Sequence, residues 1–292
     1  MLFRSGMHLQ KHPRGNIPQN CLDITEKIKY FKSHPSIKTI KDKFMKSFGF
    51  KFESVSADKI LRYINKIDIK KNSSGEISPA IIKLAKKEIL IPITNCINKC
   101  ISTKSFPHEF KVADVIPVFK KEDPNNKTNY RPISLLPIIS KIFERVLFEQ
   151  IEKFSEKMLS PKLCGFRKGH STQHALLNLL KNWQKTLDKS GVIGTVLMDL
   201  SKAYDCLPHD LLIAKLAAYG FEDSATSLIS DYLSKRYQRV KIGSAYSSYL
   251  EILRGVPQGS ISGPVLFNIF INNLIFFIQE TEVCNFAYDT TI

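Results

Sequence analysis

The amino-acid sequence predicts a mixed α/β fold, α+β in its arrangement. Apolar residues recur at helical spacing in several stretches, as at Ile60, Leu61 and Ile64, which indicates amphipathic helices. Two segments, residues 111–121 and 192–200, are instead rich in β-branched and aromatic residues, which favours strands. With 43% hydrophobic residues among 292, the chain can bury a core in one large domain or two subdomains.

The first third of the chain is expected to be helical after a short lead-in. Residues 1–33 show weak periodicity and few apolar residues, so we expect a loose N-terminal segment there. A helical extension is expected over residues 34–110. One helix within it has a marked start, because Ser78 can cap free backbone amides and Pro79 suits the first helical position.

The middle of the chain is expected to alternate between strands and helices. The strand at 111–121 is followed by a polar loop, by residues 130–136 and by a helix over about 137–157. The strand at 192–200 is apolar and ends near Asp199. We therefore expect this strand to be buried.

The last third has clear start and stop signals. A helix should begin at Pro208 and end at Gly220, because proline favours helix starts and glycine favours helix ends. Residues 239–243 and 249–253 have the pattern of a β-hairpin. A turn at 254–260 leads into an apolar helix.

That apolar helix, residues 265–278, is too short and too polar to span a bilayer, because asparagines interrupt it. We expect it to be buried in the protein, and we expect no membrane association. Residues 283–292 begin like a further strand.

The net charge of +16 is concentrated in the front half of the chain. Residues 1–130 carry 25 Lys and Arg against 12 Asp and Glu, whereas residues 131–292 carry 18 against 15. A basic half favours a polyanionic partner, most simply nucleic acid. The alternative is a solvated basic surface with no such partner.

The cysteine pattern favours reduced thiols in an intracellular protein. It leaves nucleus and cytoplasm equally open, and residues 1–15 contain no apolar stretch of the kind a secretory signal needs. Zinc binding by Cys164, His170 and His174 is disfavoured because a fourth ligand is missing. The six cysteines, none in a CxxC pair, are at positions 21, 96, 100, 164, 206 and 284.

Three groups of residues have chemical potential. Asp199 follows an apolar strand, where a carboxylate is costly unless a cation such as a metal ion pairs with it; the alternative is a helix cap or turn former. Two glycines and a proline around Gln258 form a rigid turn that lets backbone approach a ligand; the alternative is an ordinary connection. Arg131, with lysines just before it, can clamp phosphate; the alternative is a surface residue.

The order of these motifs resembles that of reverse transcriptases from non-LTR retrotransposons, the LINE-type, jockey-like elements. The resemblance covers about residues 34–292. It rests on residues 115–121, 129–135, 165–167 with Ser171 and Thr172, 199–205, 255–260 and 286–290.

The resemblance implies a right-hand polymerase fold. The reverse transcriptase domain would occupy residues 111–292, with fingers at about 111–190 and an incomplete palm at about 191–292. The thumb of this fold is expected to be absent from the chain. The implied activity is RNA-directed DNA synthesis with an RNA template, a DNA primer and dNTP, and the oligomeric state stays open.

The resemblance also implies a catalytic centre with two Mg²⁺ ions. Asp199 and Asp289 match the catalytic metal aspartates, and the backbone carbonyl of Leu200 would be a further ligand. Arg167 and Lys168 would contact the template. The positions that match nucleotide-binding residues of the family are Lys120, Lys121, Arg131, Tyr204, Gln258 and Gly259.

One position departs from the family pattern in a way that affects chemistry. Tyr288 stands where the family has the first of two aspartates, and a neutral phenol is a poor Mg²⁺ ligand. Asn273 is a smaller departure, since the family usually has aspartate after Asn272. We therefore expect a degenerate or truncated polymerase with little activity. Two alternatives stay open: an active enzyme of which this chain is a part, and a non-catalytic RNA-binding protein.

Overall fold

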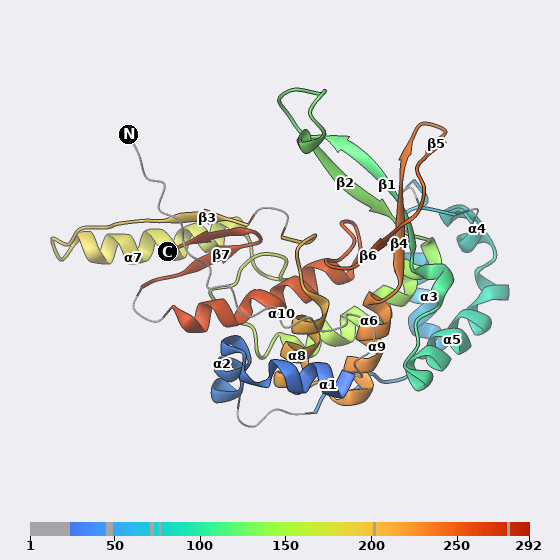
Figure 1. Cartoon of the computed structure of the whole chain (residues 1–292), viewed down its shortest axis with the longest axis horizontal. Coiled ribbons are helices and arrows are strands. Elements are labelled where there is room, and N and C mark those ends of the chain that lie inside the picture. The colour runs from blue at the N-terminus through green and yellow to red at the C-terminus, as the bar shows by residue number, and fades with distance from the viewer. Residues whose placement is uncertain (1–23, 45–48, 71–72, 76, 201–202, 279–280) are drawn as a thin grey trace.

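A computed structural model describes residues 24–44, 49–70, 73–75, 77–200, 203–278 and 281–292. It contains helices and two β-sheets, which confirms the mixed α/β prediction (Figure 1). One sheet has five strands in the order β2-β1-β4-β5, with β6 also paired to β4, and the other has three in the order β3-β8-β7. Within the described residues, no helix is long and apolar enough to cross a membrane.

The front of the chain is helical, as predicted. Its helices are α1 (Ile24–Tyr30), α2 (Pro35–Lys43), α3 (Ala57–Asn65), α4 (Pro79–Leu84) and α5 (Lys86–Thr103), with a short 3-10 helix at Phe31–Ser33. The Ser78 cap is confirmed: its hydroxyl accepts the amide of Ile81 at 3.4 Å, and Pro79 opens α4.

The loose lead-in expected over residues 1–33 was wrong for its last ten residues. Residues 24–33 form α1 and the 3-10 helix after it. Ile24 and Ile28 lie against the main core, so packing of two apolar side chains outweighed the weak local pattern. Residues 1–23 lie outside the part of the chain that the structure describes.

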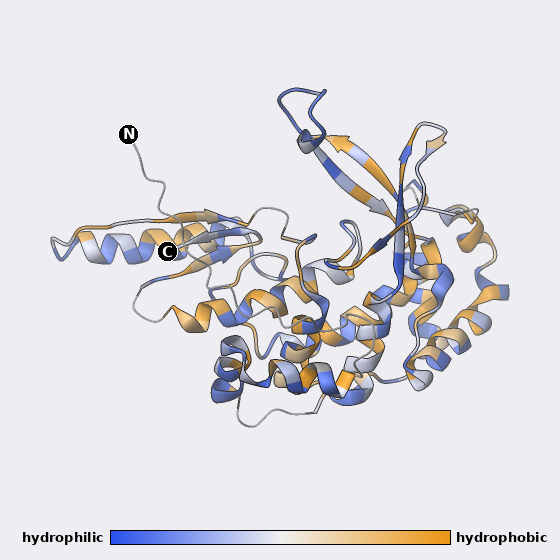
Figure 2. Cartoon of the chain, in the orientation of Figure 1, coloured by the Kyte–Doolittle hydropathy of each residue, from blue (hydrophilic) through white to orange (hydrophobic). Residues whose placement is uncertain are grey.

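The larger sheet is built on a projecting hairpin. Strands β1 (Val112–Phe119) and β2 (Tyr130–Leu135) pair antiparallel, and Figure 2 shows a hydrophobic β1 ending in a hydrophilic loop. Strand β4 (Arg236–Ile242) joins β1 in parallel, from Val112 opposite Tyr237 onward. Across this pair the Arg239 guanidinium donates to Asp114 at 2.7 Å.

The predicted hairpin after residue 236 is confirmed as antiparallel pairing of β4 with two short strands. These are β5 (Ala245–Tyr246) and β6 (Leu250–Ile252). The strand β4 begins three residues before the predicted 239–243 segment.

The core is formed by four long helices from the second half of the protein. They are α6 (Ile138–Ser155), α8 (His209–Ala218), α9 (Asp223–Leu233) and α10 (Ser262–Phe277). Helices α6, α8 and α10 confirm predicted helices, whereas α9 was not predicted. Phe106 packs edge-on against Phe143 and Tyr232, with ring centroids 5.4 and 4.9 Å apart. This packing ties α6 to α9.

One lysine is buried where α8 meets α10. Lys215 is 4% exposed, and its ammonium donates to the carbonyl of Phe270 and to Oδ1 of Asn273, both at 2.7 Å. It also lies 3.8 Å above the Phe270 ring. Burial among neutral acceptors lowers the pKa of Lys215 to about 7.

The smaller sheet contains β3 (Leu197–Asp199), β7 (Cys284–Phe286) and β8 (Asp289–Thr291), and α7 (Thr172–Leu187) lies against β7. The predicted burial of strand 192–200 was wrong. Only three residues form the strand, Leu197 is 78% exposed, and Val192 is 94% exposed. The physical reason is that β3 pairs only with β8 in the described part of the chain, so its other edge stays open.

Candidate active site

Two of the predicted metal ligands face each other across the smaller sheet. In the antiparallel register of β3 and β8, Asp199 lies directly opposite Asp289, and both residues are exposed. Directly opposed side chains share one face of a sheet, with Cβ atoms about 5 Å apart. Two like charges there repel unless a cation lies between them. Leu200 follows at once, and its amide donates to the Tyr288 carbonyl at 3.2 Å.

The loop that presents position 288 is a two-residue turn. Phe286 pairs with Asp289, which leaves Ala287 and Tyr288 as the loop between β7 and β8. Ala287 has φ 58°, the left-handed region that such hairpin turns require. The turn therefore fixes which residue stands at its tip and which begins β8.

The segment around Gly165 lies against this turn and is held there by hydrogen bonds. The amide of Cys164 donates to the carbonyl of Asn285 at 2.8 Å, and Asn268 on α10 donates to the carbonyl of Gly165 at 2.9 Å. A Cβ at Gly165 would lie only 2.0 Å from the backbone nitrogen of Ala287. Glycine is therefore required for the close approach.

Gly165→Ala is expected to destabilise the protein by about 1–3 kcal/mol, because backbone must move to admit the methyl group. Gly194→Ala is the matched control, since a Cβ there meets nothing within 4 Å, and it should change stability by less than about 0.5 kcal/mol. Thermal unfolding of both variants compares them. Equal unfolding temperatures would contradict the close approach.

Tyr288 lies within a group of four rings that we call the aromatic cluster: Phe166, Tyr204, Phe267 and Tyr288. The Tyr288 ring centroid is 5.2 Å from that of Tyr204, 5.6 Å from Phe267 and 5.8 Å from Phe166, all in edge-on contacts. Burial raises the pKa of Tyr288, and burial together with Tyr288 raises the pKa of Tyr204. Both phenols are therefore neutral at pH 7.

The residues present do not fit a centre for two magnesium ions. Among the residues that the structure describes, no group of three or more Asp, Glu, His or Cys side chains could hold a metal ion. Asp199 and Asp289 supply carboxylates, but the side chain at 288 is a phenol packed among rings.

The Gln258 turn lies beside Tyr204 and Asp205. The Gln258 side chain donates to Oδ1 of Asp205 at 3.2 Å, and the amide of Val256 donates to the Tyr204 carbonyl at 2.9 Å. Gly259 has φ +113°, and a Cβ there would lie 2.8 Å from the carbonyl of Ser134. The structure thus brings Tyr204, Gln258 and Gly259 together, as predicted.

A cavity of about 490 Å³ opens beside this turn. It is lined by residues of β2, β4, β6 and the turn itself, with both charged and apolar walls. Those that bear on the site are Pro132, Ser134, Asp205, Arg254, Val256 and Gln258. A small polar molecule would find side-chain donors and acceptors here.

The predicted basic nucleotide contacts divide into two sets. Arg131 is exposed on β2 and lies close enough to Tyr288 that its charge opposes the rise in the phenol's pKa. Lys120 and Lys121 instead follow β1 at the start of the projecting loop (Figure 1). Lys121 pairs there with Glu122 at 3.5 Å in solvent. Only Arg131 is near the aromatic cluster.

The two predicted template residues also differ. The side chain of Arg167 is 7% exposed. Its guanidinium donates to Glu156 and to the carbonyls of Ser160 and Leu163, the last two at 2.7 and 2.9 Å. These bonds turn it inward, so a template contact from Arg167 would require breaking them. Lys168 is exposed and keeps the predicted role as an untested expectation.

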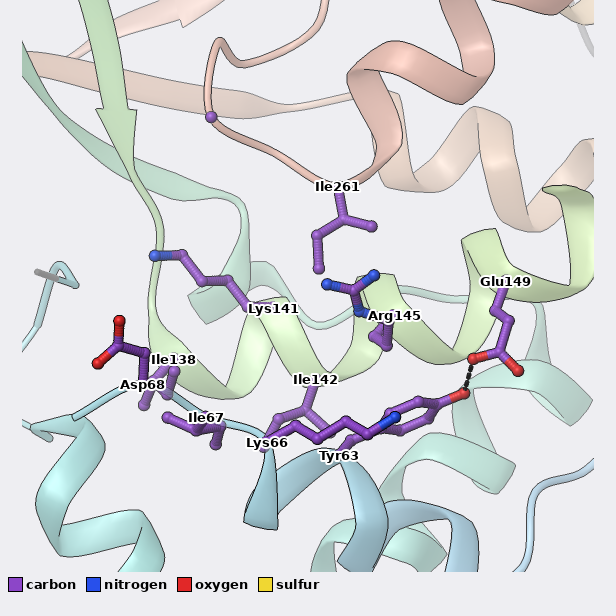
Figure 3. Close-up of a pocket in the computed structure, with 11 residues that line it drawn as sticks. Tyr63, Lys66, Ile67, Asp68, Ile138, Lys141, Ile142, Arg145, Glu149 and Ile261 are labelled. Carbon is purple, nitrogen blue, oxygen red and sulfur yellow. Dashed lines mark hydrogen bonds between the residues drawn. The ribbon is translucent and has the colours of Figure 1, made fainter. Parts of the chain in front are cut away.

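A cationic pocket of about 480 Å³ was not predicted from the sequence. Figure 3 shows Tyr63 and Lys66 on one side, Lys141 and Arg145 on α6, and Ile261 beyond them. Its lining also includes Gly259, which belongs to the Gln258 turn. The available signal was the four-residue spacing of Lys141 and Arg145, which places both on one helix face.

Two acidic residues, Asp68 and Glu149, also line this pocket. Glu149 accepts a hydrogen bond from the Tyr63 hydroxyl and an ion pair from Lys59 at 3.2 Å. Burial and Glu149 raise the pKa of Tyr63. The three cations Lys66, Lys141 and Arg145 outnumber the two acids in the lining, so the pocket carries a formal net charge of +1.

Comparison with known proteins identifies the class. Residues 119–292 match the family described as reverse transcriptase (RNA-dependent DNA polymerase). The chain therefore belongs to the reverse transcriptase family.

The relatives narrow this class to the retrotransposon kind. The chain is 28% identical over 224 residues to the probable RNA-directed DNA polymerase from transposon BS of Drosophila melanogaster, covering 75% of this chain and 25% of that protein. It is 28% identical over 246 residues to the RNA-directed DNA polymerase from mobile element jockey of Drosophila funebris, covering 81% and 27%. The predicted resemblance to LINE-type, jockey-like elements is confirmed: the chain is a reverse transcriptase domain of the LINE type.

The chain spans about a quarter of the length of these relatives. A further relative, the probable RNA-directed DNA polymerase from transposon X-element of Drosophila melanogaster, is 29% identical over 201 residues, covering 68% of this chain and 22% of that protein. Reverse transcriptases are nucleotidyl transferases that generally use divalent metal ions, with nucleic acid template, primer and nucleotides as substrates.

Proposed function

We propose that this domain binds an RNA template and a DNA primer in the manner of its family but does not extend the primer. The observation that carries this proposal is the aromatic cluster. Tyr288 holds the position of a metal aspartate, and its ring packs against three others instead of presenting a carboxylate. Without that ligand, the charge that builds on the transferred phosphate has no two-ion clamp.

The proposal assigns the two sheets to two parts of a polymerase. The five-stranded sheet with its projecting hairpin would be the fingers, and the three-stranded sheet with α10 would be the palm. Asp199 and Asp289 on β3 and β8 support this, because both lie on one face of the smaller sheet. Tyr204, whose ring contacts Tyr288, and Gln258, which donates to Asp205, would contact the nucleotide.

Primer extension tests the missing activity. We expect the chain, given an RNA template, a DNA primer, dNTP and Mg²⁺, to extend no more primer than its own Asp199→Ala variant does. The measurement is extended primer resolved by length over a range of enzyme concentrations. Robust, Asp199-dependent extension by the unaltered chain would overturn the proposal.

Template binding is supported by the cationic pocket. Lys66 and Arg145 face a space bounded by Gly259, next to the Gln258 turn. Phosphate contacts from such side chains release counterions, so affinity falls as salt rises. None of these side chains depends on a metal ion. A template site that needs no metal ion also favours a second candidate function, a non-catalytic RNA-binding protein. The extension assay distinguishes such a protein from an active enzyme.

RNA binding is therefore expected to be salt-sensitive and independent of Asp199. The Lys66→Ala and Arg145→Ala double variant should lower the log–log salt slope by about 1.4, at roughly 0.7 for each lost phosphate contact on a single strand. Arg131→Ala should also weaken binding, whereas Asp199→Ala should not.

Fluorescence anisotropy with labelled RNA at several salt concentrations measures these slopes. Lys153→Ala is the matched control, because Lys153 is exposed on the same helix as Arg145 and lies outside the pocket. An unchanged slope in the double variant would show that the pocket does not contact the template. Failure of the unaltered chain to bind RNA at low salt would remove both candidate functions.

A further inference from the structure

A buried carboxyl group connects the core to the start of α10. Glu144 on α6 is fully buried, and its Oε2 accepts the backbone amide of Ile261 at 2.7 Å. Its Oε1 lies 2.5 Å from the hydroxyl of Tyr232 on α9. Ile261 is three residues after Gln258, so Glu144 contacts the backbone that leaves the Gln258 turn.

Hydroxyl groups continue this connection into the turn itself. The Tyr232 hydroxyl lies 2.6 Å from that of Ser262, which lies 3.0 Å from the hydroxyl of Ser260. The Ser260 hydroxyl lies 2.8 Å from the carbonyl of Pro257, the residue before Gln258. We call Tyr232, Ser262 and Ser260 the hydroxyl chain.

The number of protons decides the ionisation of Glu144. The hydroxyl chain makes four contacts at hydrogen-bond distance, from Glu144 at one end to the Pro257 carbonyl at the other. Each contact needs one proton, and the three hydroxyls supply three. The carbonyl can only accept. The fourth proton must therefore come from the Glu144 carboxyl group, which donates to Tyr232 when it is protonated.

The charged groups that face Glu144 do not require its carboxyl group to be ionised. Arg236, at the start of β4, donates to the Tyr232 carbonyl at 3.0 Å and lies 4.7 Å from that ring's centroid, while its Nε and Nη2 have no hydrogen-bond partner. Lys141 on α6 is the other cation that acts on Glu144. Burial raises the pKa of Glu144, and these cations oppose the rise without an ion pair to either oxygen.

We propose that Glu144 is protonated in the folded protein and is a positioning residue that holds the Gln258 turn through the hydroxyl chain and the Ile261 amide. It touches neither substrate nor the reacting atoms. The turn that it holds carries Gln258 to Asp205 and Gly259 to the edge of the cationic pocket. Its effect on nucleotide binding rests on the proposed function of that turn, but its effect on the turn's rigidity does not.

Hydrogen exchange at the turn tests the positioning role directly. Glu144→Gln keeps an acceptor for Ile261 and supplies an N–H for Tyr232, so amides of residues 256–263 should exchange within about twofold of the unaltered chain. Glu144→Ala removes both and should speed their exchange by about tenfold or more, the equivalent of a lost bond of about 1.4 kcal/mol. Exchange is followed by mass spectrometry on the full chain.

Two further variants keep this test decisive, one if Glu144→Ala unfolds the protein and the other as a control. Tyr232→Phe keeps the ring and the Ile261 bond but breaks the hydroxyl chain, so it should loosen the turn even where Glu144→Ala unfolds the protein. Glu152→Ala is the matched control, because Glu152 is exposed on the same helix. Exchange as fast in Glu144→Gln as in Glu144→Ala would show that a charged carboxylate is needed and would overturn the protonated state.

Kinetics separate positioning from general stability. In a Tyr288→Asp background, Glu144→Ala should raise KM for dNTP more than it lowers kcat, and Glu144→Gln should restore both. If Tyr288→Asp gives no extension, the assignment of 288 as a metal position in the proposed function fails, while hydrogen exchange still decides the role of Glu144. Unchanged exchange in both Glu144→Ala and Tyr232→Phe would overturn the positioning role whatever the kinetics.

Discussion

Replacing Tyr288 by aspartate is expected to raise RNA-directed primer extension by about 100-fold or more. A carboxylate at position 288, beside the facing pair Asp199 and Asp289, would help to bind metal ions that stabilise transition-state charge by several kcal/mol, and each 1.36 kcal/mol is tenfold in rate. The register supports the geometry, because the turn residue at 288 lies next to the facing pair Asp199 and Asp289. Extension assays with Mg²⁺ compare the variant with the unaltered chain.

The same substitution should lower stability, because aspartate cannot replace the ring contacts of Tyr288. Edge-on aromatic pairs contribute about 0.5–1.5 kcal/mol each beyond the area they bury. Tyr288→Phe is the matched control: it keeps the aromatic cluster, so it should neither unfold earlier by much nor gain activity. Adding Asp199→Ala to Tyr288→Asp should abolish the gain. No gain from Tyr288→Asp would refute the assignment of 288 as a metal position.

Lys215→Met is expected to stabilise the protein at pH 7 by about 1–4 kcal/mol, the range seen when buried charges are replaced by well-packed apolar residues. Burial lowers the pKa of Lys215 to about 7, whereas an unfolded lysine titrates near 10.4. Between these values the unfolded chain holds a proton that the folded chain lacks, so stability rises with pH. The methionine variant should lose this rise.

Denaturant unfolding at pH 7, 8 and 9 measures both effects. The slope from Lys215 is at most about 1.36 kcal/mol per pH unit. Lys153→Met, at an exposed lysine of α6, is the matched control and should keep the slope. A Lys215→Met variant with the same pH dependence as the unaltered chain would contradict the lowered lysine pKa.

Asn273→Asp tests the lowered pKa of Lys215 through the residue that accepts its hydrogen bond. The Asn273 oxygen already lies 2.7 Å from the Lys215 ammonium, and no charged group is among the causes of that lysine's lowered pKa. A carboxylate there would keep the lysine charged and should stabilise the protein near pH 7. The rise in stability between pH 7 and 10 should then disappear, which the same unfolding series detects. An unaltered slope would show that residue 273 does not control the lysine.

Local signals predicted the parts of the fold that depend on neighbouring residues. Ser78 and Pro79 are the N-cap and the first residue of the helix that they start, and Gly220 follows Tyr219, the C-cap of the helix that it ends. Long-range pairing could not be predicted in this way. Nothing in the pattern of β1 specifies that β4 will lie beside it in parallel, because that pairing depends on the packing of the helices between them.

The candidate site shows the same difference between what local signals predict and what depends on long-range contacts. Motif order predicted that Asp199, Tyr204 and Gln258 share one site. The contacts pair Asp199 with Asp289, Gln258 with Asp205, and the turn at Val256 with Tyr204. The inward position of Arg167 depends on carbonyl acceptors whose placement only the folded chain defines. The hydroxyl chain was equally invisible, since serine and tyrosine carry no sequence signal until burial brings them into contact.

The parallel pairing of β1 with β4 has a consequence for synthesis on the ribosome. Asp114 and its partner Arg239 are separated by 125 residues, and contacts of such long range slow folding. At about 5–20 residues per second, β4 is made roughly 6–25 seconds after β1. During that interval the β1–β2 hairpin has an open edge, which is a template for pairing with another nascent chain. The order of translation therefore leaves this edge unpaired until β4 has been made.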